Sequence, residues 1–123
     1  MDIAFNTYSL RKEWNKLTAG DNYEPIVKFI KMMDGISEVE LLDRTFDSDP
    51  AKLKKIQEVF DSHGLSVFSL GPHISPLVGS GYRSKALEEF KHWTDMAADH
   101  DVHNFRVSLG GGRKYDKKKV WII

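Results

Sequence analysis

The feature that constrains the fold most is a strand-then-helix pattern that repeats four times along the chain. The predicted strands begin near residues 3, 38, 66 and 104, which leaves room for one helix and two loops between successive strands. Such spacing is typical of parallel strands joined by crossover helices. The pattern then ends in the apolar residues 120–123. We therefore expect an α/β fold in which residues 1–123 form one partial domain, half of a larger barrel.

Short apolar runs and helical periodicity define the expected elements. The predicted strands are Ile3–Phe5, Val39–Leu42, Leu65–Leu70 and Phe105–Leu109. A short helix is expected at Leu10–Leu17, and Asp49-Pro50 and Gly64 supply start and stop signals for a longer one. Three longer helices are predicted from apolar stripes: Ile26, Phe29, Ile30 and Met33; Leu53, Ile56, Val59 and Phe60; and Leu87, Phe90, Trp93 and Ala97.

Parallel strands with right-handed crossovers allow two architectures. Helices on both faces would give an open doubly wound domain, with residues 120–123 as a fifth strand. Helices on one face would give four units of a (β/α)8 TIM barrel. One face of the predicted strands collects polar side chains, namely Asn6, Glu38 or Glu40, Ser69, and Arg106 or Ser108. A doubly wound sheet reads as nearly continuous apolar residues, so the polar face favours the half-barrel.

The composition excludes several functional classes. The chain has 18 basic and 18 acidic residues and no cysteine, so it lacks the basic excess of nucleic-acid binders and any thiolate or disulfide chemistry. Its apolar runs are too short to span a bilayer, and its first residues lack the features of a signal peptide. We expect a cytoplasmic protein with a small-molecule or protein partner and no nucleic-acid or membrane partner.

Four segments carry a resemblance to a known family. They are Ile3–Arg11, Val39–Asp43, Gly71–His73 and Phe105–Gly112. In their order and spacing they resemble the sugar phosphate isomerase/epimerase group of the xylose-isomerase-like TIM barrels, which also include zinc endonucleases acting at abasic DNA sites. The resemblance extends over essentially the whole chain and corresponds to the first four of eight barrel units.

The resemblance implies proton transfer next to the carbonyl of a sugar or sugar phosphate, through an enediolate. In such enzymes a divalent metal (Mn, Mg or Zn), held by carboxylates and a histidine, binds neighbouring substrate oxygens while a carboxylate base moves the proton. Most of those ligands come from the second half of the barrel. The metal ligands of this chain are therefore left unassigned.

Glu40 and His73 are the candidate catalytic residues. Glu40 matches the acidic residue on the second strand of the family, but it can equally be neutralised by Arg106, because alternate barrel strands contribute to one side-chain layer. His73 follows the third strand, where the resemblance implies active-site loops and, in the nucleases, a metal-binding histidine. The alternative for His73 is a loop histidine that bonds only to backbone.

The candidate substrate-binding residues are Asn6, Tyr8, Arg106, Gly110 and Gly111. The amides of Gly110 and Gly111 can present donors to a phosphate, or the segment can be a plain turn, because it lacks the pattern of a nucleotide-binding loop. Tyr8 and Trp14 can stack on a sugar ring or can simply pack in the core.

Two non-enzymatic alternatives also fit the sequence. A half-barrel leaves the edges of its first and fourth strands unpaired, so the chain can pair with a second copy or a complementing half and bind a ligand without turnover. A doubly wound regulatory domain of the receiver type is the other alternative. It is disfavoured because the first strand is not followed by an acidic pair that would bind magnesium.

Overall fold

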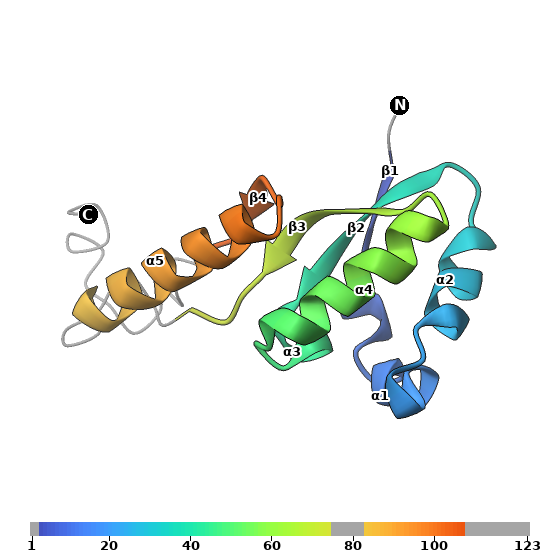
Figure 1. Ribbon diagram of the computed structural model, residues 1–123, viewed down its shortest axis with the longest axis horizontal. Helices are drawn as coiled ribbons and strands as arrows, with labels where there is room; N and C mark the ends of the chain where they lie inside the picture. The colour runs from blue at the N-terminus through green and yellow to red at the C-terminus, as the bar shows by residue number, and fades with distance from the viewer. Residues whose placement is uncertain (1–2, 75–82, 108–123) are drawn as a thin grey trace, which may run out of the picture.

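The computed structural model describes residues 3–74 and 83–107, and these form a parallel sheet with helices packed against it (Figure 1). The elements in chain order are β1 (Ile3–Asn6), η1 (Thr7–Leu10), α1 (Trp14–Leu17), η2 (Ala19–Asp21), α2 (Glu24–Lys31), β2 (Ile36–Leu42), α3 (Asp43–Phe46), α4 (Pro50–Ser62), β3 (Ser66–Gly71), α5 (Arg83–Asp99) and β4 (Asn104–Phe105).

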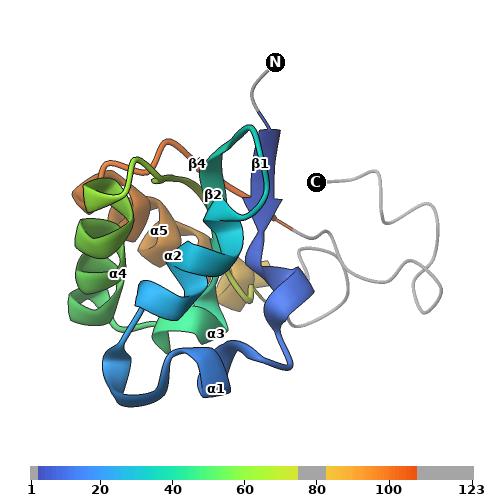
Figure 2. The same cartoon turned by 90° about the vertical axis from the view of Figure 1, so that its right-hand side faces the viewer.

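The four strands are hydrogen-bonded in the order β1-β2-β3-β4, and every pair is parallel. The α/β class and the parallel sheet predicted from the sequence are therefore confirmed. Strands that follow one another in space as in sequence, with crossovers of one hand, carry their helices on one face. In both views α4 and α5 lie on the same side of the sheet (Figures 1 and 2). A doubly wound sheet needs a reversal of strand order, and the described sheet has none.

The helices begin and end where the sequence signals them. In α4 the Asp49 side chain accepts a hydrogen bond from the backbone N–H of Ala51, and Pro50 occupies the first turn, where its missing N–H costs nothing. Gly64 follows the helix with a φ of 75°, which only glycine adopts without strain. Helix α2 likewise has a proline, Pro25, in its first turn.

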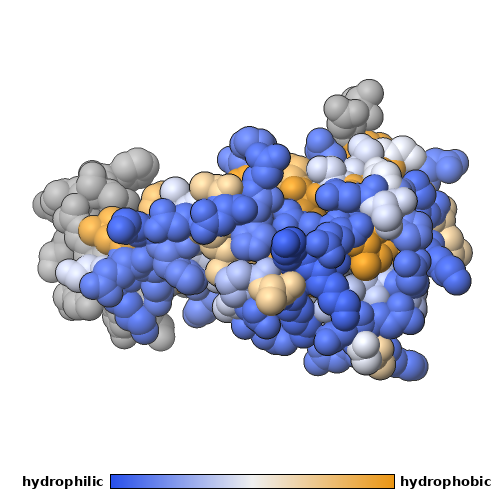
Figure 3. All heavy atoms as spheres, viewed as in Figure 1, coloured by the Kyte–Doolittle hydropathy of each residue, from blue (hydrophilic) through white to orange (hydrophobic). Residues whose placement is uncertain are grey.

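The core lies between the sheet and the helices. Val39 and Leu41 of β2, Val67 and Leu70 of β3 and the inner faces of α2, α4 and α5 form one cluster. The fully buried members from these three helices are Ile26, Val27, Ile30, Leu53, Ile56, Phe60 and Ala86. The outward faces of α4 and α5 are mostly hydrophilic (Figure 3). A single cluster shared by three helices indicates that the opposite face of the sheet is the one left for polar side chains.

Two predicted stripes need correction. Leu87 is 54% exposed, Phe29 is 41% exposed and Phe90 is 39% exposed, so none of the three is a core residue. In α5 the buried face runs through Ala86, Trp93 and Ala97. Phe29 instead covers the edge of Phe5 on β1, with 6.4 Å between ring centroids.

The element bounds also differ from the sequence predictions. Strand β2 begins three residues earlier than predicted, and the predicted Leu10–Leu17 helix is instead the 3-10 turn η1 followed by the one-turn α1. Strand β4 covers only Asn104–Phe105, so the prediction is wrong for Arg106 and Val107, which are described but are not in a strand. The rest of the predicted range, from Ser108 on, lies outside the described residues. The possible fifth strand at 120–123 lies outside them as well.

A buried tyrosine lies at the start of α2. Tyr23 is 1% exposed, and its hydroxyl has no hydrogen-bond partner among the described residues. Burial, together with the negative charge of Asp21, raises its pKa above the ordinary value of 10.0. The pKa of neighbouring Lys52 is also raised, chiefly by its hydrogen bond to Asp47 at 2.7 Å.

These two shifts predict a loss of stability at alkaline pH. A raised pKa means that the folded chain keeps the proton at pH values where the unfolded chain has released it. The contribution of each group to the free energy of unfolding is therefore fully present below about pH 10 and falls as pH rises further. We expect Tyr23→Phe to reduce this fall and, at neutral pH, to leave stability unchanged or higher by about 1 kcal/mol, because an unpaired buried hydroxyl is removed. Urea unfolding between about pH 8 and pH 11 measures both effects. If the free energy of unfolding depends on pH identically in the wild-type chain and in Tyr23→Phe, the role assigned to Tyr23 is wrong.

Candidate functional site

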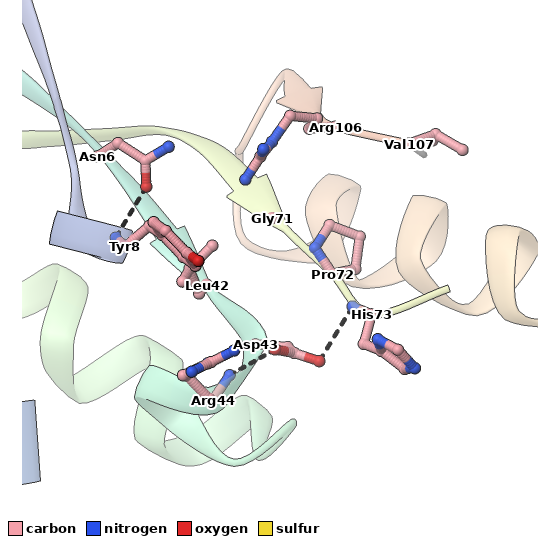
Figure 4. A pocket seen from close by; sticks show the side chains of 10 residues that line it. All are labelled: Asn6, Tyr8, Leu42, Asp43, Arg44, Gly71, Pro72, His73, Arg106 and Val107. Atoms are coloured by element: carbon pink, nitrogen blue, oxygen red, sulfur yellow. Dashed lines mark hydrogen bonds between the residues drawn. The ribbon is translucent and has the colours of Figure 1, made fainter. Parts of the chain in front are cut away.

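A pocket of about 480 Å³ opens at the carboxyl ends of the strands (Figure 4). All four strands contribute to its wall through their last residues or the residues that follow. The lining residues are Asn6, Tyr8, Leu42, Asp43, Arg44, Gly71, Pro72, His73, Arg106 and Val107. The carboxyl edge is where parallel α/β folds place their ligands, because loops of adjacent units converge there. This pocket is therefore the candidate site.

The polar face predicted from the sequence is confirmed, and two of its residues, Asn6 and Arg106, also line this pocket. Register places Asn6 beside Glu40, and Glu40 beside Ser69. The Glu40 carboxylate accepts hydrogen bonds from Asn6 Nδ2 at 3.0 Å and Ser69 Oγ at 3.0 Å. Arg106 Nη2 lies 3.1 Å from Glu40 Oε1, with side-chain exposures of 59% for Arg106 and 11% for Glu40. The ion pair expected between strands two and four is thus present.

Gly71 makes room for this network. A Cβ at position 71 would lie 2.8 Å from Leu42 Cδ2, closer than such atoms approach, and 3.3 Å from Arg106 Nη2. Any larger residue would displace the Arg106 guanidinium from Glu40 or force Leu42 out of place. The glycine therefore lets the end of β3 approach the arginine closely.

Thr7 joins the ends of β1 and β2. Its side chain is fully buried, and its hydroxyl donates to the carbonyl oxygen of Glu40 at 2.9 Å and accepts from the N–H of Leu42 at 3.2 Å. One hydroxyl thus satisfies two backbone groups on either side of Leu41. This residue fixes the backbone that presents Glu40 and was not among the sequence predictions.

Asn6 and Tyr8 form one wall. Asn6 Oδ1 accepts the backbone N–H of Tyr8 at 2.9 Å, which caps the turn η1. The Tyr8 ring is half exposed, and the Arg11 guanidinium lies 4.2 Å from its centre. A guanidinium stacked on a phenol ring holds that ring in place. Tyr8 thus lines the pocket, and its role in substrate binding stays a prediction.

Asp43 joins the ends of β2 and β3. Its Oδ1 accepts the N–H of Arg44 at 2.7 Å, and its Oδ2 accepts the N–H of His73 at 3.0 Å (Figure 4). Both oxygens of the carboxylate are thus engaged by backbone. The His73 ring is exposed and lies on the side of the pocket away from Asn6 and Tyr8 (Figure 4).

The remaining residues predicted for the site are Trp14, Gly110 and Gly111. Trp14 is buried and donates its indole N–H to the carbonyl oxygen of Thr45 at 3.2 Å, so it packs in the core and cannot stack on a sugar. Gly110 and Gly111 lie outside the described residues.

A divalent metal, which the family resemblance implies, does not fit the described residues. Among them no three His, Asp or Glu side chains lie close enough together to hold an ion. Glu40 already has three donors on its two oxygens, and the Asp43 oxygens bind backbone N–H groups. A metal requires free oxygen or nitrogen ligands, so these residues are arranged to satisfy one another and not an ion.

Neither a protein-family model nor a curated protein sequence matches this chain. Within residues 3–74 and 83–107, no helix has both the length and the apolar character that crossing a membrane requires.

Proposed function

We propose that this chain is the N-terminal half of a xylose-isomerase-like barrel and that its pocket binds a sugar or sugar phosphate. Three features support the half-barrel: the sequential parallel order, helices sharing one core, and a polar opposite face. In a closed barrel that polar face becomes the interior below the active site. The edges of β1 and β4 would then pair with a second copy or with a complementing half.

The convergence of polar groups from four strand ends on one pocket is the observation that carries the binding proposal. The pocket wall includes the half-exposed ring of Tyr8, the amide of Asn6 and the N–H donors of Arg106 that Glu40 does not use. Sugars are recognised by such a mixture of planar ring surfaces and fixed hydrogen-bond donors. The pocket volume of about 480 Å³ lies within the range typical of small-molecule sites.

The second candidate function is ligand binding without turnover, and the state of Glu40 favours it for this chain alone. A general base needs a lone pair free to reach the substrate proton. Glu40 instead accepts from Asn6, Ser69 and Arg106, which holds the carboxylate in place as a structural anchor. In this proposal isomerase or epimerase chemistry requires acidic and histidine side chains supplied by the other half of the barrel.

Calorimetric titration tests the binding proposal. We expect D-ribose 5-phosphate or D-fructose 6-phosphate to bind with a saturable heat and a Kd below about 10 mM, since only a few hydrogen bonds form without a metal. The matched control is Gly71→Val, which closes the pocket beside Leu42 and should abolish the heat while circular dichroism reports whether the variant folds. Absence of saturable binding for both phosphates and both parent sugars would contradict the proposal.

A further inference from the structure

Arg44 is the pocket residue whose charge the described structure leaves unused. It follows β2 in the short helix α3, its side chain is exposed, and it lines the pocket on the same side as Tyr8 (Figure 4). Its backbone N–H bonds to Asp43, but its guanidinium makes no ion pair or hydrogen bond with the described residues. Arg44 was not among the residues predicted from the sequence.

The other two arginines around the pocket have partners. Arg106 faces Glu40 at 3.1 Å, and Arg11 stacks on Tyr8 and donates to its carbonyl oxygen at 3.1 Å. Both Asp43 oxygens accept backbone N–H groups, and this carboxylate forms no ion pair among the described residues. Among the described residues, the guanidinium of Arg44 is therefore the arginine group on the pocket wall that has no partner and is available for a ligand.

We propose that Arg44 binds the phosphate of a phosphorylated sugar, and so determines that the pocket prefers phosphate esters to neutral sugars. This inference rests on the proposed function and names its ligand class. A guanidinium offers parallel N–H donors that match two phosphate oxygens, and such charge-assisted pairs are about twice as strong as neutral ones.

The layout of the pocket fits this assignment. Arg44 stands on one side, while Arg106 lies on the other with donors beyond the one that meets Glu40 (Figure 4). A sugar phosphate has its charge at one end and its hydroxyl groups along the rest. Its phosphate can lie against Arg44 while its hydroxyls reach the polar groups of Asn6 and Arg106.

The test compares three ligands on the whole chain and on the variants Arg44→Gln and Arg44→Lys. The ligands are D-ribose 5-phosphate, D-ribose and D-ribonate, which differ in bearing a phosphate, no charge or a carboxylate. We expect Arg44→Gln to weaken phosphate-ester binding by about 10- to 100-fold, with partial recovery in Arg44→Lys, and to change ribose binding by less than about twofold. Lys55→Gln, on the exposed face of α4, controls for the loss of one positive charge.

Each outcome separates the two proposals. If the wild-type chain binds none of the ligands, the proposed function fails and this inference fails with it. If wild-type binds the sugar phosphate and Arg44→Gln binds it equally well, the proposed function stands and the role of Arg44 is wrong. Equal or tighter, Arg44-dependent binding of D-ribonate would overturn the assignment to phosphate. Equal losses in Arg44→Gln and Lys55→Gln would show an effect of net charge only and would also overturn it.

Discussion

Replacement of Thr7 by valine is expected to lower the free energy of unfolding by about 2 to 3 kcal/mol. The side chains are nearly equal in shape, so the change removes only the hydroxyl that bridges the Glu40 carbonyl oxygen and the Leu42 N–H. The bridging hydroxyl is fully buried, and water cannot replace the lost bonds without opening the contact between β1 and β2. Urea denaturation followed by tryptophan fluorescence measures the loss.

Thr7→Ser is the matched control for this prediction. Serine keeps the bridging hydroxyl and loses only a methyl group, so its cost should be about 1 kcal/mol or less. If the valine and serine variants lose the same stability, packing of the methyl group and not the hydroxyl bridge holds the two strand ends together.

Substitutions of Glu40 and Arg106 are expected to lower the free energy of unfolding by large and non-additive amounts. Arg106→Ala should cost about 2 kcal/mol, because it leaves a carboxylate that is 11% exposed without its counterion; the exposure of the arginine keeps the cost below that of a fully buried pair. Glu40→Ala should also cost about 2 kcal/mol, since Asn6 and Ser69 lose their acceptor. The double variant should lose less than the sum by at least about 1 kcal/mol.

Equilibrium unfolding of the four proteins gives this coupling energy. Lys52→Ala combined with Arg106→Ala is the control pair, because Lys52 bonds to Asp47 and Asp21 and not to Glu40. That pair should be additive. Additive losses for Glu40 and Arg106 would mean that the observed 3.1 Å contact contributes nothing to stability.

The polar network could be predicted from the sequence because it depends on alternation alone. Once the strands are placed, every second residue of β2 faces away from the helices, and Glu40 lies between the apolar Val39 and Leu41. The parallel pairing of β2, β3 and β4 then brings Glu40 close to Arg106, the residue that follows β4. Local pattern and parallel topology were sufficient for this part of the site.

Residues whose roles depend on longer-range geometry could not be found in this way. Thr7 acts through the register of β1 against β2, and a lone threonine after a strand carries no signal of it. Arg44 lies in α3, a helix of four residues that is too short to show periodicity. The rotation of α5 was misjudged because Ala86 and Leu87 are adjacent, and only the approach of the helix to the sheet decides which is buried.

The most direct test of the central claim is to map where a sugar phosphate binds. In ¹⁵N-labelled protein titrated with D-ribose 5-phosphate and D-fructose 6-phosphate, we predict saturable amide shifts that cluster at Tyr8, Arg44, Gly71 and His73, around the strand ends. Amides on the outer face of α4, such as those of Lys54 and Lys55, should not move. Shifts absent from the strand ends, or spread over α4, would contradict a sugar-binding site at the carboxyl edge of the sheet.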